Sequence, residues 1–444
     1  MLHANSFSII LALLASSLVQ GLAKLEPADG KLIFGAWFDS STGPVSGGET
    51  AASFNKKIGF NSGVFQVYQH LPPRLPKDGP PDYDTKNHNA DGTINLDILN
   101  EGTDAAIFLT IYPDNSTGIA DSDINALAIQ CRTIINTTGR NLFIRFGPEM
   151  NGDWMSYSGN PTAYIALWRK VYTAVNNVAP SVAFVWSPNP DTYQGIYPYA
   201  PYWPGPDYVD WVGLSTYWKG FQDNYPYSYM KNSLCPTDYT AQVLDAKGQQ
   251  GSKVSFYQEY VLKYDKPFVI SEGGGAFQLA YSEGSNRTLV DPGPGRTQMV
   301  MGFWNSNIFN PDFMNAYPKV KMAISFEIWK LEAEQQFATE RDFRIIGDDA
   351  TASTFRTAIM KLDDAGHMIW AKVVPAKTSA TTAAEQTTAA VTTTTSALAT
   401  SALVVTQNPS NKDAVTQKTS YSPAKTSISL TLLLSILIIA LMLF

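Results

Sequence analysis

The sequence contains few of the residues on which several classes of protein depend. Among its 444 residues only Cys131 and Cys235 are cysteines, and four are histidines. Two cysteines exclude a fold held together by a disulfide framework, and neither has the companion residues of a zinc site. We expect no metal and no organic cofactor. Whether the two thiols pair in an oxidising compartment is left open, because the distance between their Cα atoms decides it.

Charge is scarce as well. Charged residues make up 16% of the chain and its net charge is −7. Without a basic patch to attract phosphate groups, nucleic acid is excluded as a partner. Aromatic residues make up 12% of the chain, and this ring-rich composition is typical of an ordered extracellular protein that handles sugars.

The first residues predict entry into the secretory pathway. A short polar start is followed by an apolar run from Phe7 to Leu18, then by Gly21 and Ala23 at the spacing that signal peptidase favours. A membrane anchor is disfavoured because the run is shorter than the roughly 20 residues that a spanning helix needs. We interpret residues 1–23 as a signal peptide.

The last part of the sequence predicts a stalk and an anchor signal. Residues 376–425 are rich in Thr, Ser and Ala, which predicts a disordered, O-glycosylated linker. Residues 426–444 form an apolar block behind a polar, small-residue segment, as in signals for a glycosylphosphatidylinositol (GPI) anchor. A plain tail anchor is the alternative. We expect a protein attached through this lipid to the plasma membrane or cell wall, with N-glycosylation at the sequons of Asn115, Asn136 and Asn286.

Residues 24–375 alternate short β-rich runs with longer amphipathic ones, the order of a parallel sheet covered by helices. Eight such strands close most simply into a (β/α)8 barrel, so the fold class is α/β. The expected strands are 32–38, 62–68, 106–112, 142–147, 183–186, 209–217, 268–271 and 321–329. The helices read from the same segment are 122–135, 161–176, 252–264, 297–307 and 352–362.

Two glutamates follow the fourth and seventh of these strands. Glu149 is followed at once by Asn151 and Trp154, and Glu272 is followed by three glycines, which we expect to let a substrate approach the backbone. Chemistry in such barrels takes place at the carboxyl ends of the strands. A carboxyl pair standing about 5 Å apart there cleaves a glycoside with retention, one carboxylate attacking the anomeric carbon while the other donates and recovers a proton.

Five motifs occur in order: RFGPEMNGDW, PTAYIALWRKVY, FVWSPNP, YWPGPDYVDWVGLSTYW and KPFVISEGG. In this order and spacing the chain resembles glycoside hydrolase family 26, best known for endo-β-1,4-mannanases and including some β-glucan-cleaving enzymes. The similarity runs in register from Leu142 to Gly274 and more loosely to Trp329. It implies a (β/α)8 barrel with Glu149 as acid/base, Glu272 as nucleophile and Tyr217 as the tyrosine that orients the nucleophile. The family usually carries a histidine directly before the acid/base, and this chain has Pro148, which puts mannan specificity in question.

Other residues are candidates for substrate contact. Arg145 points inward on its strand and pairs with a carboxylate either at the site or in a purely structural ion pair. Asn151 supplies an amide beside Glu149. The tryptophans at strand ends are candidates for stacking on sugar rings, with a place in the core as the alternative for each; they are Trp154, Trp186, Trp218 and Trp329.

The sequence therefore predicts a monomeric, surface-anchored retaining hydrolase of a β-linked polysaccharide in a eukaryotic microbe. Mannan is the first expectation and β-glucan the second. Transglycosylation by the same covalent intermediate and a non-catalytic, glycan-binding wall protein are the alternatives.

Overall fold

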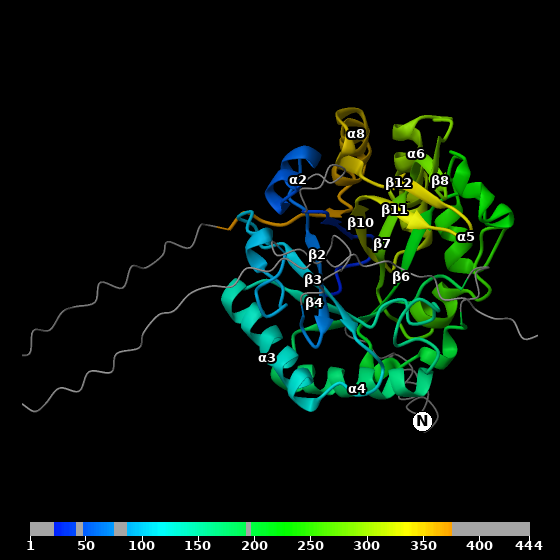
Figure 1. The fold of residues 1–444 in the computed structure, drawn as a ribbon. Coiled ribbons are helices and arrows are strands. Elements are labelled where there is room, and N and C mark those ends of the chain that lie inside the picture. The colour runs from blue at the N-terminus through cyan, green and yellow to red at the C-terminus, as the bar shows by residue number, and fades with distance from the viewer. Residues whose placement is uncertain (1–21, 41–47, 75–86, 192–196, 375–444) are drawn as a thin grey trace, which may run out of the picture. The chain divides into compact units, whose positions relative to one another are not determined.

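The computed structural model describes residues 22–40, 48–74, 87–191 and 197–374. Its centre is a closed barrel of eight parallel strands, in which the eighth pairs with the first (Figure 1). The strands are β1 (Leu32–Phe38), β2 (Val64–Leu71), β3 (Ala106–Pro113), β4 (Leu142–Phe146), β5 (Ala183–Trp186), β6 (Trp211–Trp218), β7 (Phe268–Gly275) and β10 (Val320–Glu327). The predicted (β/α)8 barrel is confirmed, and each expected strand overlaps an observed one.

Side-chain alternation along the strands explains how the barrel is filled. One buried cluster takes residues from alternate positions of neighbouring strands, including Val64, Phe108, Phe143 and Val269. Residues at the intervening positions, such as Ile107 and Ile144, belong to the larger cluster that includes the helices. Both faces of each strand are therefore buried, as in other parallel sheets, which is why these strands read as nearly continuous apolar runs.

Helices follow most of the strands (Figure 1). Local signals fix their ends: α4 begins at Pro161 behind the capping Asn160, and α3 is followed by Gly139 at φ +71°. The helices are α2 (Ala51–Ile58), α3 (Asp121–Thr138), α4 (Pro161–Val178), α5 (Tyr239–Asp245), α6 (Arg296–Phe303), α7 (Pro311–Ala316) and α8 (Asp349–Asp364). Of two π-helical segments, Tyr257–Leu262 lies within the expected helix 252–264, and Trp304–Ile308 extends one residue beyond the expected helix 297–307.

A second, antiparallel sheet stands at the carboxyl end of the barrel and was not predicted. It consists of β8 (Phe277–Glu283), β9 (Asn286–Leu289), β11 (Trp329–Ala333) and β12 (Ala338–Asp342), in the order β11-β12-β8-β9. A single residue separates β7 from β8 and β10 from β11, so the chain runs from the barrel straight into this sheet. A short strand, β13 (Met368–Ile369), pairs with β1 at the start of the barrel.

The predicted linker and apolar tail, and nearly all of the predicted signal peptide, lie outside the described residues. Across the described ranges no helix is both long and apolar enough to cross a membrane. Cys131 and Cys235 are free and buried. Burial raises the pKa of the Cys131 thiol to about 12 and also raises that of Cys235, so neither is a ready nucleophile.

Candidate active site

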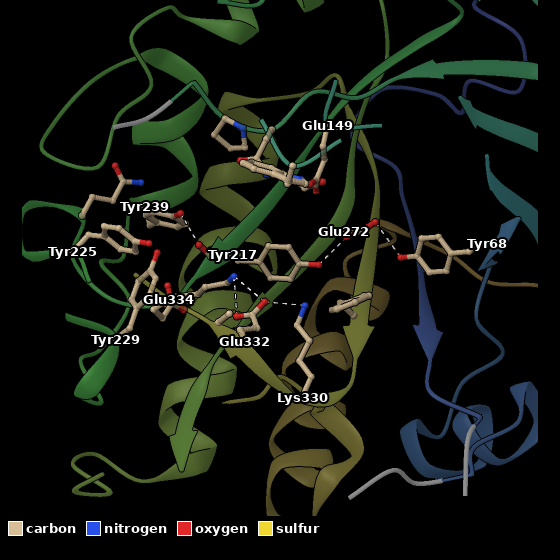
Figure 2. Close-up of a pocket in the computed structure, with 18 of the residues that line it drawn as sticks. Tyr68, Glu149, Tyr217, Tyr225, Tyr229, Tyr239, Glu272, Lys330, Glu332 and Glu334 are labelled. Atoms are coloured by element: carbon tan, nitrogen blue, oxygen red, sulfur yellow. Dashed lines mark hydrogen bonds and ion pairs between the residues drawn. The ribbon is translucent and has the colours of Figure 1, made fainter. Parts of the chain in front are cut away.

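A pocket of about 560 Å³ contains both candidate glutamates (Figure 2). Its walls come from the carboxyl ends of barrel strands, from the segment that follows β6, and from β11. Most of the lining side chains are aromatic or charged, the two kinds of group that bind sugar rings and hydroxyls. The lining residues used below are Tyr68, Tyr112, Glu149, Trp154, Ser215, Tyr217, Lys219, Tyr229, Glu272, Phe326, Lys330, Glu332 and Glu334.

Glu272 lies on β7 with only 7% of its surface exposed, and three side chains hold its carboxylate. Oε2 accepts a hydrogen bond of 2.9 Å from the Tyr217 hydroxyl. Oε1 accepts one of 3.0 Å from the Tyr68 hydroxyl and an ion-paired one from Arg145. These three partners fix the carboxylate in one orientation toward the pocket.

Burial, and after it the charge of Glu272, raises the pKa of the Tyr217 hydroxyl well above its ordinary value. The same two causes act on Tyr68. Both hydroxyls therefore stay protonated, and each donates a hydrogen bond to the carboxylate.

Arg145, on β4, lies between the two glutamates and is fully buried. One terminal nitrogen binds Glu272, while the other donates to Ser215 Oγ at 2.6 Å and lies 3.9 Å from Glu149 Oε1. Burial lowers the pKa of this guanidinium, but the negative charges around it, with Glu272 first, outweigh that effect and raise it. A permanent cation therefore faces both carboxylates. Arg145 was expected to pair with a carboxylate either at the site or in a purely structural ion pair, and the structure shows it paired at the site.

Glu149 sits in a sharp turn that directs its side chain into the pocket. Its φ is +55°, a left-handed conformation that costs a residue with a side chain about 1–2 kcal/mol. Two backbone hydrogen bonds of 2.9 Å hold the turn, from Glu149 N to Ser187 O and from Gly152 N to Glu149 O. At this left-handed residue the chain turns away from the direction of β4, and the Glu149 carboxylate lies beside Arg145.

Trp154 covers this turn and remains half exposed. Its indole N–H donates a hydrogen bond of 3.1 Å to Glu149 Oε2. The ring lies so close to Gly152 that a Cβ there would stand 2.4 Å from it. Glycine at 152 is thus required for the tryptophan to lie against the acid and still present a face to the pocket.

The model of glycosyl hydrolase family 26 matches residues 52–274, half of the chain. The chain belongs to glycosyl hydrolase family 26. It is therefore a glycoside hydrolase, as the sequence predicted, and the match includes both pocket glutamates. No protein with curated function matches the sequence.

Solved structures of other family 26 enzymes are similar to this chain at 14% identity. A Cellulomonas fimi endo-β-1,4-mannanase double mutant shares a TM-score of 0.47 over 77% of this chain and 73% of its own. The catalytic domain of the Bacillus sp. JAMB-750 endo-β-1,4-mannanase shares 0.46 over 77% and 87%.

Two of the four candidate tryptophans of this glycoside hydrolase belong to its core. Trp186 is 0% exposed and packs against Trp203, Phe256 and Tyr260. Trp218 is also 0% exposed, with its N–H donating to Ser233 O. The prediction that they stack on sugars was wrong, because strand-end position does not say on which side of the sheet a ring lies.

Asn151 and Trp329 are not among the residues that line the pocket. Asn151 is fully buried and ties two loops together through Asn189 and the Tyr197 carbonyl. Trp329 is half-buried, with the Arg344 guanidinium 5.6 Å from its ring centre. Asn151 therefore has a structural role in place of the predicted contact with substrate, whereas the contact of Trp329 stays a prediction.

The three glycines after Glu272 also act differently from the expectation. A Cβ at Gly275 would stand 2.5 Å from the Met299 carbonyl of α6, and one at Gly274 would stand 3.3 Å from Phe343. None of them lines the pocket. These glycines let α6 and Phe343 pack closely on β7. The expectation that they let a substrate approach the backbone was wrong.

Pro148 is buried, does not line the pocket, and accepts a hydrogen bond from Tyr157 through its carbonyl. Pro148 therefore presents no polar side chain to the pocket. The three sequon residues Asn115, Asn136 and Asn286 are all exposed.

Most residues of one wall of the pocket were not predicted from the sequence. Tyr68 and Tyr112 could have been found, since both stand near the carboxyl ends of strands, where chemistry in such barrels takes place. Lys330 and Glu332 could not, because they lie on β11, whose pairing with β12 has no distinct signal in the sequence. We define Lys219, Lys330, Glu332, Glu334 and Arg341 together as the charged wall.

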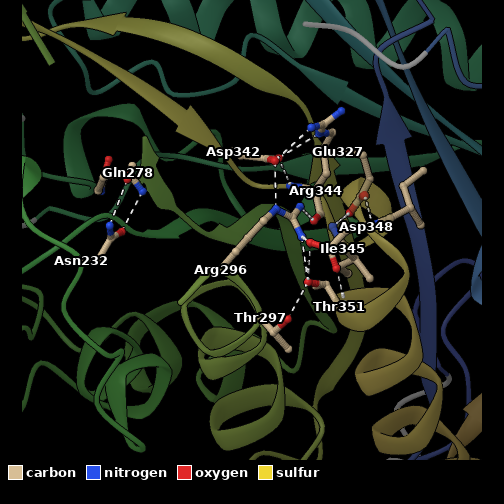
Figure 3. Close-up of polar contacts among 11 residues, drawn as sticks. Asn232, Gln278, Arg296, Thr297, Glu327, Asp342, Arg344, Ile345, Asp348 and Thr351 are labelled. Carbon is tan, nitrogen blue, oxygen red and sulfur yellow. Dashed lines mark hydrogen bonds and ion pairs between the residues drawn. The ribbon is translucent and has the colours of Figure 1, made fainter. Parts of the chain in front are cut away.

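A third strand-end carboxyl group, Glu327 of β10, does not reach the pocket. Figure 3 shows it beside the backbone of Ile345, from which Oε1 accepts a hydrogen bond of 3.1 Å. Oε2 accepts another from Ile346 N, and Ser325 donates to Oε1. Burial raises the pKa of Glu327 to about 7. Nearby, Arg296 and Arg344 both bind Asp342.

Proposed function

We propose that this enzyme hydrolyses internal β-linkages of a cell-wall polysaccharide, of mannan type first, with retention of configuration. Glu272 attacks the anomeric carbon, and Glu149 protonates the leaving oxygen and then removes a proton from water. The observation that carries the proposal is the pair of carboxylates on one buried guanidinium, that of Arg145, at the floor of an aromatic pocket.

The surroundings of the two acids support this division of roles. Glu272 accepts hydrogen bonds from two tyrosines and an arginine, which favour a negative charge ready for attack. Glu149 is more exposed, with 14% of its side chain accessible, so it can exchange a proton with solvent between the two steps. Sharing one guanidinium keeps the two groups close, and retaining enzymes place theirs about 5–5.5 Å apart.

Arg145 binds the nucleophile and does not line the pocket, so we infer that it is a positioning residue and does not touch the sugar. Trp154, which is half exposed, and Tyr112, which is partly buried, line the pocket, and we infer that their rings stack on sugar units. Tyr217 orients the nucleophile through its hydroxyl.

Pro148 keeps β-glucan as the second candidate substrate. A buried proline supplies no donor or acceptor side chain next to the reacting carbon, so a contact that would distinguish one sugar from another is missing. Transfer of the glycosyl group to a sugar hydroxyl in place of water uses the same intermediate and is the second candidate reaction.

The test is digestion of a polysaccharide panel by the purified full chain, with product mapping. We expect release of oligosaccharides from mannan, glucomannan or mixed-linkage β-glucan, and no release by Glu149→Ala or Glu272→Ala. Absence of cleavage on all three polymers by the unmodified enzyme would point to a glycan-binding wall protein. An added oligosaccharide acceptor that lengthens the products would identify transglycosylation.

We also propose that the enzyme acts at the cell surface on a GPI anchor, with residues 376–425 as the stalk. The patterns of residues 1–23 and 426–444 support this, and the three exposed sequons agree with glycosylation during secretion. Release of the protein from cells by a phosphatidylinositol-specific phospholipase is expected, and retention after treatment would contradict the anchor.

A further inference from the structure

The pocket has a second polar region, next to Tyr217 and away from Glu149. In Figure 2 Glu332 of the charged wall lies below the Tyr217 ring, with Lys330 on one side of it and Glu334 on the other. Lys219 Nζ stands 5.4 Å from the centre of that ring, and the Tyr217 hydroxyl reaches Glu272. The wall is therefore about one tyrosine side chain away from the nucleophile, where a neighbouring sugar unit would bind.

Glu332 is the centre of the wall and has no acceptor capacity to spare. Lys219 lies 3.0 Å from Oε1 and 2.9 Å from Oε2. Lys330 lies 2.8 Å from Oε1, and Arg341 binds Oε2. Burial raises the pKa of Glu332, but these three cations outweigh it and hold the pKa well below its usual range. The carboxylate thus serves to hold cations, and a sugar hydroxyl would find little to bind on it.

The balance of charge in the wall is positive. Lys219, Lys330 and Arg341 face two carboxylates, Glu332 and Glu334, which leaves one net positive charge. Arg341 is completely buried, stands opposite Lys330 in the β11–β12 pair, and binds Glu332 and Glu334. A purely structural role in this strand pair would not need two more cations on the pocket side.

Both lysines are fixed in place and accessible. Their side chains are 23% and 31% exposed, more than the 16% of Glu332 between them. Each also lies against an aromatic ring, Lys219 against Tyr217 and Lys330 against Phe326 at 4.9 Å. Two ammonium groups held by a shared carboxylate and by ring faces lose little freedom when they bind a ligand.

We propose that the charged wall binds an anionic group on the sugar unit adjacent to the one that is cleaved, so that the natural substrate is an acidic β-linked polysaccharide. A uronate carboxylate and a phosphate ester present the same oxyanion to the two lysines. The inference rests on the proposed hydrolase function and adds the charge of its substrate.

The experiment compares one backbone in three forms: neutral glucomannan, the same polymer oxidised to carboxylates at C6 to a low degree, and the same polymer phosphorylated. We measure kcat/KM at low and high salt with the full chain. An anionic form should be cleaved about tenfold more efficiently than the neutral one, and the preference should shrink at high salt because salt screens the attraction. Which anionic form is preferred separates a uronate from a phosphate ligand.

The Lys330→Gln variant should lose most of this preference, because kcat/KM falls more on the anionic polymer than on the neutral one, whereas Lys330→Arg, which keeps the positive charge, should retain it. Lys361→Gln, an exposed lysine of α8, is the control and should behave like the unmodified enzyme. A structural role of Lys330 would lower both activities together.

Binding separates the failure of this inference from failure of the proposed function. Titration calorimetry with Glu149→Gln measures affinity for the neutral and anionic oligosaccharides without turnover. If nothing is cleaved but anionic ligands bind tighter through Lys330, the charged wall stands and the hydrolase proposal fails. The inference is overturned if the neutral polymer is cleaved or bound as well as the anionic ones and Lys330→Gln leaves kcat/KM and affinity unchanged. The charged wall would then not recognise an anionic group.

Discussion

Glu272 and Glu327 stand near the carboxyl ends of two neighbouring barrel strands, yet their surroundings make them different groups. Glu272 faces a buried cation and two tyrosine hydroxyls, and it opens to the pocket. Glu327 is 1% exposed, and its three partners are neutral: one serine and two backbone amides. The arginines near Glu327 are bound to Asp342 (Figure 3).

The comparison shows that strand-end position and burial do not make a carboxyl group reactive. Burial without a cation raises the pKa of Glu327 to about 7, so the group holds its proton at mildly acidic pH. A cation in contact stabilises a negative charge instead, and an anion is what attack on a sugar requires. The cation in contact, Arg145 of β4, distinguishes the surroundings of Glu272 from those of Glu327 more than the position of either carboxylate on its strand does.

The largest expected effect follows from removing either pocket carboxylate. Glu272→Ala should lower kcat by at least about 10⁴-fold because no covalent intermediate can form. Glu149→Ala should lower it by about 10²–10⁴-fold on substrates with a poor leaving group. Steady-state kinetics on the preferred polymer measures both, and azide should restore part of the Glu149→Ala rate with activated substrates. Glu272→Ala with near-normal kcat would contradict the assignment.

Removal of the shared cation should come next. Arg145→Met leaves two carboxylates facing each other without compensation, which we expect to cost about 3–5 kcal/mol and lower kcat/KM by roughly 10³-fold. Arg296→Met is the matched control near Glu327, because Arg296 binds Asp342 and Asp348 outside the pocket. It should reduce thermal stability but leave kcat per folded molecule unchanged. Equal kinetic losses in the two variants would break the comparison.

Tyr217→Phe removes one of the two hydroxyl donors to Glu272. A hydrogen bond to a charged group contributes about 1.5–3 kcal/mol, so kcat should fall by roughly 10–100-fold with little change in KM. Tyr172→Phe on helix α4, outside the pocket, controls for loss of a tyrosine hydroxyl. A change confined to KM would mean that Tyr217 binds sugar and does not orient the nucleophile.

Trp154 and Trp186 offer a smaller contrast between a pocket tryptophan and a core one. Trp154→Ala should raise KM roughly tenfold through lost stacking, with modest loss of stability. Trp186→Ala should instead cost about 3–5 kcal/mol of unfolding free energy, because its ring is completely buried. Chemical denaturation and Michaelis kinetics on both variants test the distinction. It fails if Trp154→Ala mainly lowers stability and Trp186→Ala mainly raises KM.

The smallest effect on activity is expected at Glu327, where the signature is pH-dependent stability. Its folded-state pKa of about 7 lies above the ordinary value of 4.5, so the folded protein binds the extra proton between these values. Stability from this group is complete below pH 4.5 and is lost as the pH rises to about 7, by about 3 kcal/mol. Glu327→Gln should remove that slope in urea unfolding and leave kcat nearly unchanged. An unaltered slope would contradict the raised pKa.

Much of the barrel could be predicted from the sequence because parallel strands buried on both faces read as short apolar runs between helices. The ends of β1 and β5 agree residue for residue with the prediction. Strand β10 was extended too far, to 329, because the chain continues into β11 with one intervening residue. Composition cannot show that a strand changes sheets at that point.

The two carboxylates could be located because each follows an apolar strand and because the motifs around them are specific to a family. The side of the sheet on which each aromatic ring lies could not be predicted from the sequence. Trp186 and Trp218 occupy strand ends like Tyr217, but they point into the core, and a one-residue change of register decides the side. The charged wall depends on the pairing of β11 with β12 and on a segment after β6, contacts that are distant in sequence.

The central claim is that Glu272 forms a covalent bond to the sugar. The most direct measurement is reaction of the full chain with a 2-deoxy-2-fluoroglycosyl fluoride matched to the preferred polymer, followed by peptide mass spectrometry. Our account predicts time-dependent inactivation, one added sugar on Glu272, and recovery when an acceptor is supplied. A label on Glu149 or Glu327, or cleavage with inverted configuration and no labelled peptide, would contradict it.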